Sequence, residues 1–223
     1  MTLDETIAAL EAAGSEQTRK TYARHGVGPN MYGVSYAFLG KFVKKIKSDH
    51  ELARELWATG NHDCRVVATM IADPEKLTVR DLDAWSKDLD SYPLTDAFAR
   101  LAAQTSHART RAEKWIAANG ERIECAGWTI LGLLAGTNGD LPDSYFEKHL
   151  ETIEHGIHGA KNRVRHSMNM ALISIGGYRP KLTEKAIATS GRIGKVEVDH
   201  GDTACKTPDA AEYIRKMVAR RKK

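Results

Sequence analysis

The sequence predicts an all-α fold of stacked helical hairpins, and three observations support it. Apolar residues recur at helical spacing through most of the 223 residues. Residues that can cap a helix stand before many of these segments, and glycine or proline often follows them. Alternation typical of a β-strand occurs convincingly in one stretch only, residues 195–198. With 42% hydrophobic residues, the chain can bury one substantial core or form a short repeat array.

The part of the chain up to residue 85 divides into predicted helices with clear ends. Their apolar stripes stop at Gly14, Gly26 and Gly60, and the pair Asp73–Pro74 ends another. Four of these helices follow a side chain that can accept hydrogen bonds from the first turn, and these capping residues are Ser15, Ser35, Asp49 and Thr78. A fifth is expected from about residue 62 to 72. A loop rich in glycine and proline covers residues 26–33.

Further helices are predicted after residue 92. Pro93 suits the first position of one of them, because its missing N–H is not needed there. The others are expected at about 108–116, 122–134, 146–157 and 160–175, from Tyr178 onward, and from about Pro208 to the basic C-terminal tail.

The spacing of these helices favours a repeat architecture. A helix pair takes ~35–45 residues, which is the period of helical-hairpin solenoids such as HEAT or armadillo repeats. A single-domain helical bundle is the alternative, because the sequence repeat itself is weak. We expect one superhelical domain over residues 1–223, with an irregular loop at about 191–207 before the last helix. The concave face of such a stack suits a long ligand such as a DNA duplex.

Composition limits the classes of function. A net charge of +4 permits nucleic-acid binding without requiring it. Three scattered cysteines, with no close pair, indicate reduced thiols and a cytoplasmic protein. We expect no membrane partner, because neither a signal peptide nor a long apolar stretch is visible. His155 and His158 share a helix, but no clear further ligand accompanies them, so we predict no metal and no cofactor.

One carboxylate stands out as a candidate site. Asp96 lies about 200° around the helix from Leu94, at ~100° per residue, and is therefore off the face formed by Leu94, Phe98 and Leu101. It is also expected near the positive helix N-terminus. The aromatic ring of Tyr92 precedes it by one helical turn. Such a pair could hold a cationic ligand, although Asp96 could equally be an exposed acid favoured by the helix dipole.

Basic side chains form two candidate DNA-binding surfaces. The first is the outer face of the helix after Ser35, with Lys41, Lys44, Lys45 and Lys47. The second is a helical stripe with Arg163 and Met170, accompanied by Lys161 and Arg165. Either could instead be an ordinary solvated face. Arg65 is a further candidate, with an ion pair to Asp63 or to a neighbouring helix as its alternative role.

Several segments, in this order, resemble the DNA alkylation repair family of HEAT-like glycosylases. The segment 32–35, followed by Leu39 and Lys44–Ile46, is similar to the entry helix of that family, and residues 61–68 resemble its helix with a central arginine. Residues 92–96 are similar to its catalytic segment, an aromatic residue four positions before an aspartate. Residues 191–210 resemble the C-terminal section of one branch of the family.

This resemblance implies a superhelical HEAT-like fold and a specific chemistry. Active members remove cationic alkylated purines from double-stranded DNA without a cofactor, and they use an Asp to stabilise the developing positive sugar and to position water. By this resemblance, Asp96 takes the place of the catalytic Asp, and Tyr92 that of the first Trp. The family's active-site Arg falls near Glu124–Cys125, and its second Trp falls near Met170, so two of the four residues differ in kind.

We therefore expect a monomeric DNA-binding protein with alkylpurine glycosylase activity. Asp96 and Tyr92 are the predicted catalytic residues. The predicted DNA-binding residues are Lys41, Lys44, Lys45, Arg65, Lys161, Arg163, Arg165 and Met170. A catalytically silent DNA-binding relative and a helical-repeat scaffold that binds protein are the two alternatives.

Overall fold

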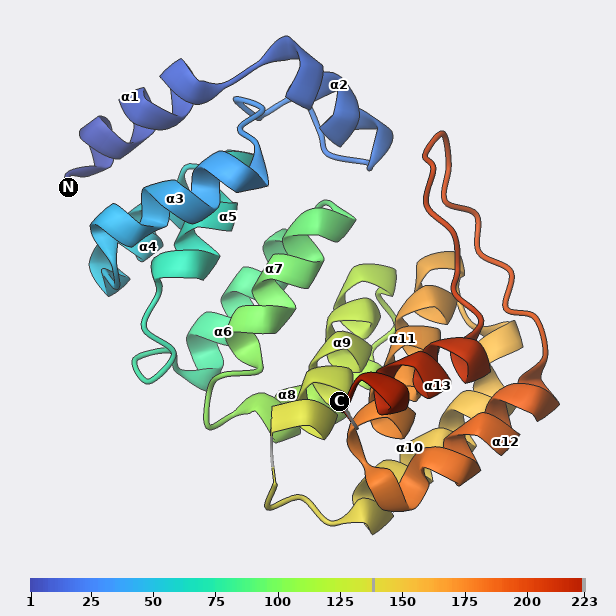
Figure 1. Cartoon of the computed structure of the whole chain (residues 1–223). Helices are drawn as coiled ribbons and strands as arrows, with labels where there is room; N and C mark the ends of the chain where they lie inside the picture. The colour runs from blue at the N-terminus through green and yellow to red at the C-terminus, as the bar shows by residue number, and fades with distance from the viewer. Residues whose placement is uncertain (138, 222–223) are drawn as a thin grey trace. The chain divides into compact units, whose positions relative to one another are not determined.

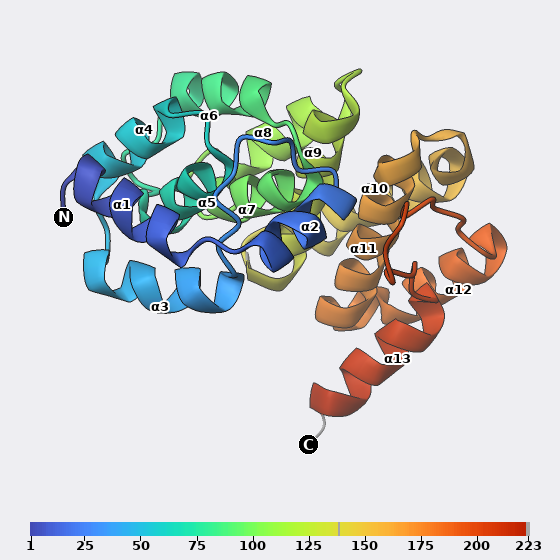
Figure 2. The same cartoon turned by 90° about the horizontal axis from the view of Figure 1, so that it is seen from above.

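The computed structural model describes residues 1–137 and 139–221, and within them the regular secondary structure is entirely helical. Figures 1 and 2 show the α-helices, with extended segments between α2 and α3 and before the last helix. The described chain divides into two compact units. The first comprises residues 1–107 and 201–203, and the second comprises the rest of the described chain. The predicted all-α fold is confirmed.

The helices of the first unit are α1 to α7, with a 3₁₀ turn, η1, after α6. Their bounds are α1 Leu3–Ala13, α2 Glu16–Arg24, α3 Tyr36–Ile46, α4 His50–Ala58, α5 His62–Ile71, α6 Val79–Trp85, η1 Ser86–Asp88 and α7 Tyr92–Ala102. The predicted caps are confirmed, because each of these side chains accepts a hydrogen bond from its helix's first turn: Ser15, Ser35, Asp49 and Thr78.

The second unit contains α8 to α13 and two 3₁₀ turns. Their bounds are α8 Ala108–Ile116, α9 Glu121–Thr137, α10 Asp143–Gly156, η2 Ile157–Gly159, α11 Asn162–Tyr178, η3 Pro180–Leu182, α12 Thr183–Ile193 and α13 Ala210–Arg221. The helix α11 packs along α9 and also contacts α12 and α13. The residue Ile214 of α13 is fully buried against Gly176 of α11.

Two boundary predictions need correction. The strand expected at 195–198 does not form, because residues 194–209 have no regular secondary structure. The helix α7 begins at Tyr92, so Pro93 is its second residue and not its first. Ser91 occupies the N-cap position without making a side-chain capping bond.

A buried carboxylate fixes the connection between α2 and α3 in the first unit. The Asp63 side chain, near the start of α5, is fully buried. Its Oδ2 accepts from the N–H groups of Tyr32 at 2.7 Å and Gly33 at 3.0 Å, and its Oδ1 accepts from the N–H of Val34 at 2.9 Å. Gly33 has a φ of 78°, and a Cβ at this position would lie 2.8 Å from the Ser15 carbonyl oxygen. Since buried charges require such partners, the loop and α5 are held in one register.

Aromatic stacking forms another part of the first unit's core. The rings of Trp57 in α4 and Trp85 in α6 lie 4.2 Å apart and nearly parallel. The Nε1–H of Trp57 donates to the Asp88 carboxylate at 2.8 Å. In the second unit, Trp115 and Trp128 are each 1% exposed, on α8 and α9. Each unit therefore contains two largely buried indoles.

The long segment before α13 is attached to α11 by polar side chains of that helix. The side-chain amide of Asn162 donates to the carbonyl of Asp199 at 2.7 Å, and its oxygen accepts from the N–H of the same residue at 2.8 Å. The guanidinium of Arg165 donates to the carbonyl of Glu197, and the amide of Asn169 donates to the carbonyl of Pro208. Side chains of α11 thus bond to backbone groups that would pair with a neighbouring strand in a β-sheet.

Replacing Asp63 with Asn should destabilise the protein. The amide has one acceptor oxygen and no charge, so at least one buried N–H of the 32–34 loop loses its partner, at a cost of about 2 kcal/mol or more. Urea unfolding followed by circular dichroism measures the change. Asp49→Asn is the matched control, because Asp and Asn cap helices equally well. Equal stability of Asp63→Asn and wild type would contradict this role.

Candidate nucleic-acid interface

Asp96 lies off the buried face of α7, as its spacing from Leu94 predicted. Its side chain is exposed, whereas Leu94, Phe98 and Leu101 are buried. Tyr92 is half-buried one turn earlier, so the two side chains lie on the same side of the helix. The sequence suggested that the positive helix N-terminus stabilises the Asp96 carboxylate, and this stabilisation is weaker than expected. Asp96 lies outside the first turn of α7, where the macrodipole is weak.

A second aromatic side chain, which the sequence did not reveal, is near Asp96. Tyr36 is the first residue of α3 and is 42% exposed. Desolvation of its hydroxyl raises the pKa of Tyr36 to about 12, and the negative charges of Asp96 and Asp63 add to this effect. The positive charge of Arg100 opposes it. Tyr36 therefore stays protonated at neutral pH and offers a ring and a donor in the neighbourhood of Asp96.

Asp96 has Arg100 and Tyr36 as neighbours, and the spacing along the chain could have revealed only Arg100. Arg100 follows Asp96 by four residues, which places the two on the same side of α7. Tyr36 belongs to a different helix, and no local pattern connects it to Asp96. Its position depends on the loop that Asp63 holds.

The lysines of α3 are exposed and carry uncompensated charge. Lys41, Lys44 and Lys45 point to solvent, with Lys47 just beyond the helix. Among the residues that the structure describes, none of these four lysines forms an ion pair with a carboxylate. The helix itself contains no acidic residue. These ammonium groups are thus available to an anionic ligand.

Arg65, in contrast, is occupied by the protein itself. Its side chain is 14% exposed, its Nε donates to the carbonyl of Trp57, and a second nitrogen donates to the carbonyl of Asp88. Its guanidinium lies 3.5 Å from the Asp88 carboxylate and 3.8 Å from that of Asp90. It does not pair with Asp63, which binds backbone N–H groups instead. A structural role is well supported, and contact with DNA stays a prediction.

The candidate residues at the start of α11 also have intramolecular partners. The Nζ of Lys161 donates to the carbonyl of Asn119 at 2.7 Å and lies 3.6 Å from the Glu124 carboxylate. Arg163 donates to Nδ1 of His200 at 2.9 Å. Arg165 donates to the carbonyl of Ala160 at 2.9 Å. Their roles in binding DNA stay predictions, as does that of the half-buried Met170.

The position where the resemblance places the family's arginine is closed to solvent. Cys125 is 2% exposed. Burial raises the pKa of Glu124, and the neighbouring Lys161 partly offsets that effect. An acid and a buried thiol thus occupy the region where the family has a guanidinium.

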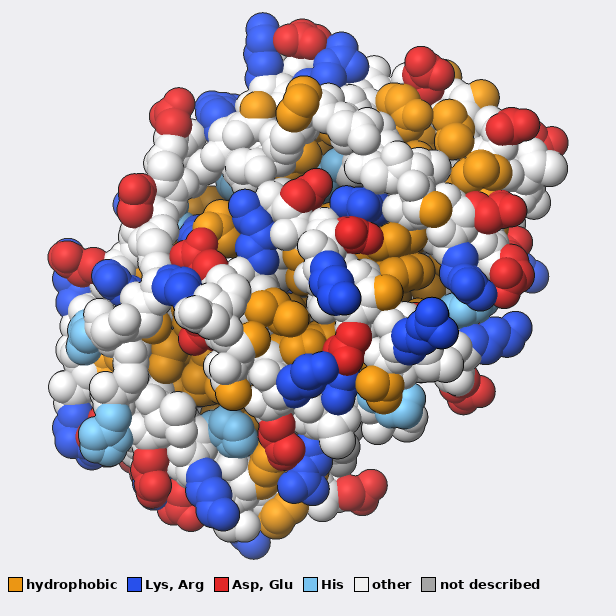
Figure 3. Space-filling model, turned by 180° about the vertical axis from the view of Figure 1, so that it is seen from behind, with side chains coloured by type: hydrophobic (Ala, Val, Ile, Leu, Met, Phe, Trp, Pro, Cys, Tyr) orange, Lys and Arg blue, Asp and Glu red, His pale blue; other side chains and the backbone are white. Residues whose placement is uncertain are grey.

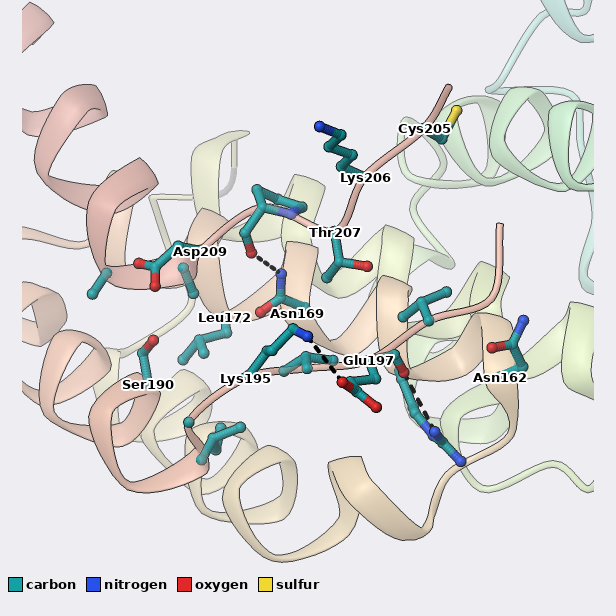
Figure 4. A pocket seen from close by; sticks show the side chains of 18 of the residues that line it. Asn162, Asn169, Leu172, Ser190, Lys195, Glu197, Cys205, Lys206, Thr207 and Asp209 are labelled. Atoms are coloured by element: carbon teal, nitrogen blue, oxygen red, sulfur yellow. Dashed lines mark hydrogen bonds and ion pairs between the residues drawn. The ribbon is translucent and has the colours of Figure 1, made fainter. Parts of the chain in front are cut away.

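A cleft of about 930 Å³ lies in the second unit, between residues 194–199 and 205–209, α11 and α12. Figure 4 shows Asn162, Asn169, Lys195 and Glu197 around it, with the hydrogen bonds that Arg165 and Asn169 of α11 donate to the segment. Near this segment, Arg163 donates to Nδ1 of His200, so Nε2 of that ring carries the proton and donates to Thr207. Burial, followed by the charge of Arg163, lowers the pKa of His166 to about 4.

Charge is mixed on one face of the molecule. Figure 3 shows basic, acidic and apolar side chains interspersed on one face of the molecule. Within residues 1–137 and 139–221, no group of three His, Cys, Asp or Glu side chains converges as a metal site would require. No described helix combines the length and apolarity needed to cross a membrane. Because the charges on this face are interspersed, a candidate surface for an anionic ligand is defined by the side chains of one helix and not by the whole face.

Comparison with known proteins identifies relatives over the full chain. A protein of Listeria innocua is 31% identical over 97% of both chains, and one of Listeria monocytogenes is 30% identical over 100% of both. A solved structure shares 33% identity with a TM-score of 0.91, covering 99% of this chain and 95% of the other. It is described as a new family of proteins related to the HEAT-like repeat DNA glycosylases with affinity for branched DNA structures.

The fold is therefore of the HEAT-like repeat class, as the hairpin spacing predicted. The model of the DNA alkylation repair enzyme family matches residues 6–214. This range includes Asp96, the lysines of α3 and the first five residues of α13. On these grounds the chain belongs to the DNA alkylation repair enzyme family.

Proposed function

We propose that this protein binds DNA and has affinity for branched DNA structures. The observation that carries the proposal is α3, whose exposed lysines have no carboxylate partner among the described residues. The solved relative with affinity for branched DNA supports the choice of ligand. Phosphate contacts by such lysines release counterions from DNA and supply most of the non-specific affinity.

The α3 lysines are favoured over the other basic groups, because they need not break hydrogen bonds within the protein before they contact a phosphate. Arg65 and Arg165 would have to give up hydrogen bonds to backbone carbonyls before they could contact a phosphate. Lys41, Lys44 and Lys45 have nothing to give up except water. We infer that the chain acts as one DNA-binding domain, as a monomer in the cytoplasm, in keeping with three free cysteines.

We propose alkylpurine glycosylase activity at Asp96 as a second candidate function. It is favoured by the exposed Asp96 carboxylate, with Tyr92 on the same side of α7 and Tyr36 nearby. A cationic alkylated base would leave as a neutral base with the bonding electron pair. Asp96 would stabilise the positive sugar, and the proton of the attacking water would pass to its carboxylate and then to solvent. Tyr92 would contact the cationic nucleotide through its ring.

The residues of the second unit favour a catalytically silent relative instead. The buried Cys125 and the thioether of Met170 lie where active members have a guanidinium and an indole. DNA binding through α3 requires neither group, so the first proposal does not depend on the second. A scaffold that binds only proteins would show no salt-dependent DNA binding.

Replacing Lys41, Lys44 and Lys45 with Gln should weaken DNA binding in a salt-dependent way. The slope of the logarithm of the binding constant against the logarithm of salt concentration should fall by about 3, because about one counterion is lost per phosphate contact. Fluorescence anisotropy with a labelled four-way junction measures this slope. A triple change of Lys20, Lys76 and Lys87 to Gln removes the same charge elsewhere in the first unit. An unchanged slope in the α3 variant would exclude α3 from the interface.

Asp96→Asn tests the glycosylase proposal. If the wild-type protein releases N7-methylguanine from methylated duplex DNA, the variant should release it about a hundredfold more slowly, with junction affinity unchanged. Chromatography of the released bases gives the rate. Undiminished release by Asp96→Asn would refute the catalytic role. No release by the wild type would establish the silent relative and leave the DNA-binding proposal standing.

A further inference from the structure

The helices α3 and α13, one in each unit, carry the same arrangement of side chains. In α3 an exposed ring, Phe38, is followed by Lys41 and Lys45, three and seven positions later. In α13 an exposed ring, Tyr213, is followed by Lys216 and Arg220 at the same spacing. At ~100° per residue, positions i, i+3 and i+7 form one stripe along a helix. Phe38 is 38% exposed and Tyr213 is 44% exposed.

Packing on α11 fixes the direction of the α13 stripe. Ile214 is fully buried against Gly176, and Met217 contacts Gly177. The guanidinium of Arg221 lies 5.0 Å from the ring of Tyr178, the last residue of α11. Lys216 and Arg220 lie more than ~100° around the helix from Ile214. Tyr213, Lys216 and Arg220 are all exposed, so the stripe faces solvent.

The cations of the α13 stripe are available for a ligand. Within the described part of the chain, Arg220 has no ion-pair partner. Lys216 lies 2.5 Å from the Glu212 carboxylate, but both side chains are more than 60% exposed. Such a pair between exposed side chains contributes little, so a phosphate can replace the carboxylate at small cost.

We infer that the stripe of Tyr213, Lys216 and Arg220 is a second phosphate-binding surface, and that it binds the backbone of a branched DNA. This inference rests on the proposed DNA binding and adds a surface to that of α3. Each cation of the stripe that contacts a phosphate releases a counterion, so the surface contributes to the salt dependence of binding.

The exposed rings fit the same ligand. Bases next to a branch point are less constrained by stacking than those inside a duplex, and aromatic side chains bind unstacked bases without a sequence preference. Phe38 and Tyr213 each stand at one end of a cationic stripe. A ring in this position can contact a base or a sugar while the cations follow the phosphates.

The test compares variants of each stripe on two DNA ligands. The α13 variant is Lys216→Gln with Arg220→Gln, and the α3 variant is Lys41→Gln with Lys45→Gln. A second-unit control, Lys148→Gln with Lys181→Gln, removes two exposed charges outside the stripes. Affinity and salt slope are measured by anisotropy for a four-way junction and for a linear duplex of one arm's length. Circular dichroism melting verifies that each variant is folded.

Each result separates this inference from the proposed function. We expect either stripe variant to lower junction affinity and to reduce the junction salt slope by about 2, because two phosphate contacts are lost. The loss of affinity should be larger for the junction than for the linear duplex, and the second-unit control should change neither. A junction affinity and salt slope that stay unchanged in the α13 variant would overturn the second surface alone. Absence of any wild-type DNA binding would overturn the proposed function itself.

Discussion

The first unit depends on one buried charge. Asp63 accepts three backbone N–H groups from residues 32–34, so the loop between α2 and α3 is held on the start of α5. Ser35 then caps α3, and Tyr36 is its first residue. The position of Tyr36 near Asp96, and the outward direction of the α3 lysines, therefore follow from hydrogen bonds to the buried Asp63 side chain. A neutral replacement would loosen both at once.

The basic residues of this protein divide into two groups by the partners they already have. Arg65, Lys161, Arg163 and Arg165 all donate to groups of the protein, and three of them bond to backbone carbonyls. The lysines of α3 and the cations of α13 have water or weak exposed partners. Phosphate binding competes with existing bonds in the first group and with hydration in the second. Net charge alone does not make this distinction.

Local chemistry made the helices and the core side of α7 predictable. Caps at Ser15, Ser35, Asp49 and Thr78 are recognisable because the capping side chain and its target belong to the same turn. The proximity of Tyr36 to Asp96 was not predictable, because it depends on a tertiary contact through Asp63. The bonds from Arg163 to His200 and from Arg165 to Glu197 were not predictable either, because they also join segments that lie far apart in the sequence.

The error at 195–198 is informative in its own way. Val196 and Val198 are half-buried, whereas Lys195 and Glu197 are exposed, so the alternation in the sequence does describe two faces. The backbone partners are side chains of α11 rather than a neighbouring strand. Periodicity reports which side of an extended segment is covered, and it does not report what covers it.

The four tryptophans are divided equally, with Trp57 and Trp85 in the first unit and Trp115 and Trp128 in the second. Only the first pair is stacked face to face, at 4.2 Å, where the excited states of two indoles interact. The stacked pair has a spectroscopic signature of its own, distinct from that of separate buried indoles. Near-ultraviolet ellipticity can thus follow the unfolding of the first unit without any attached dye.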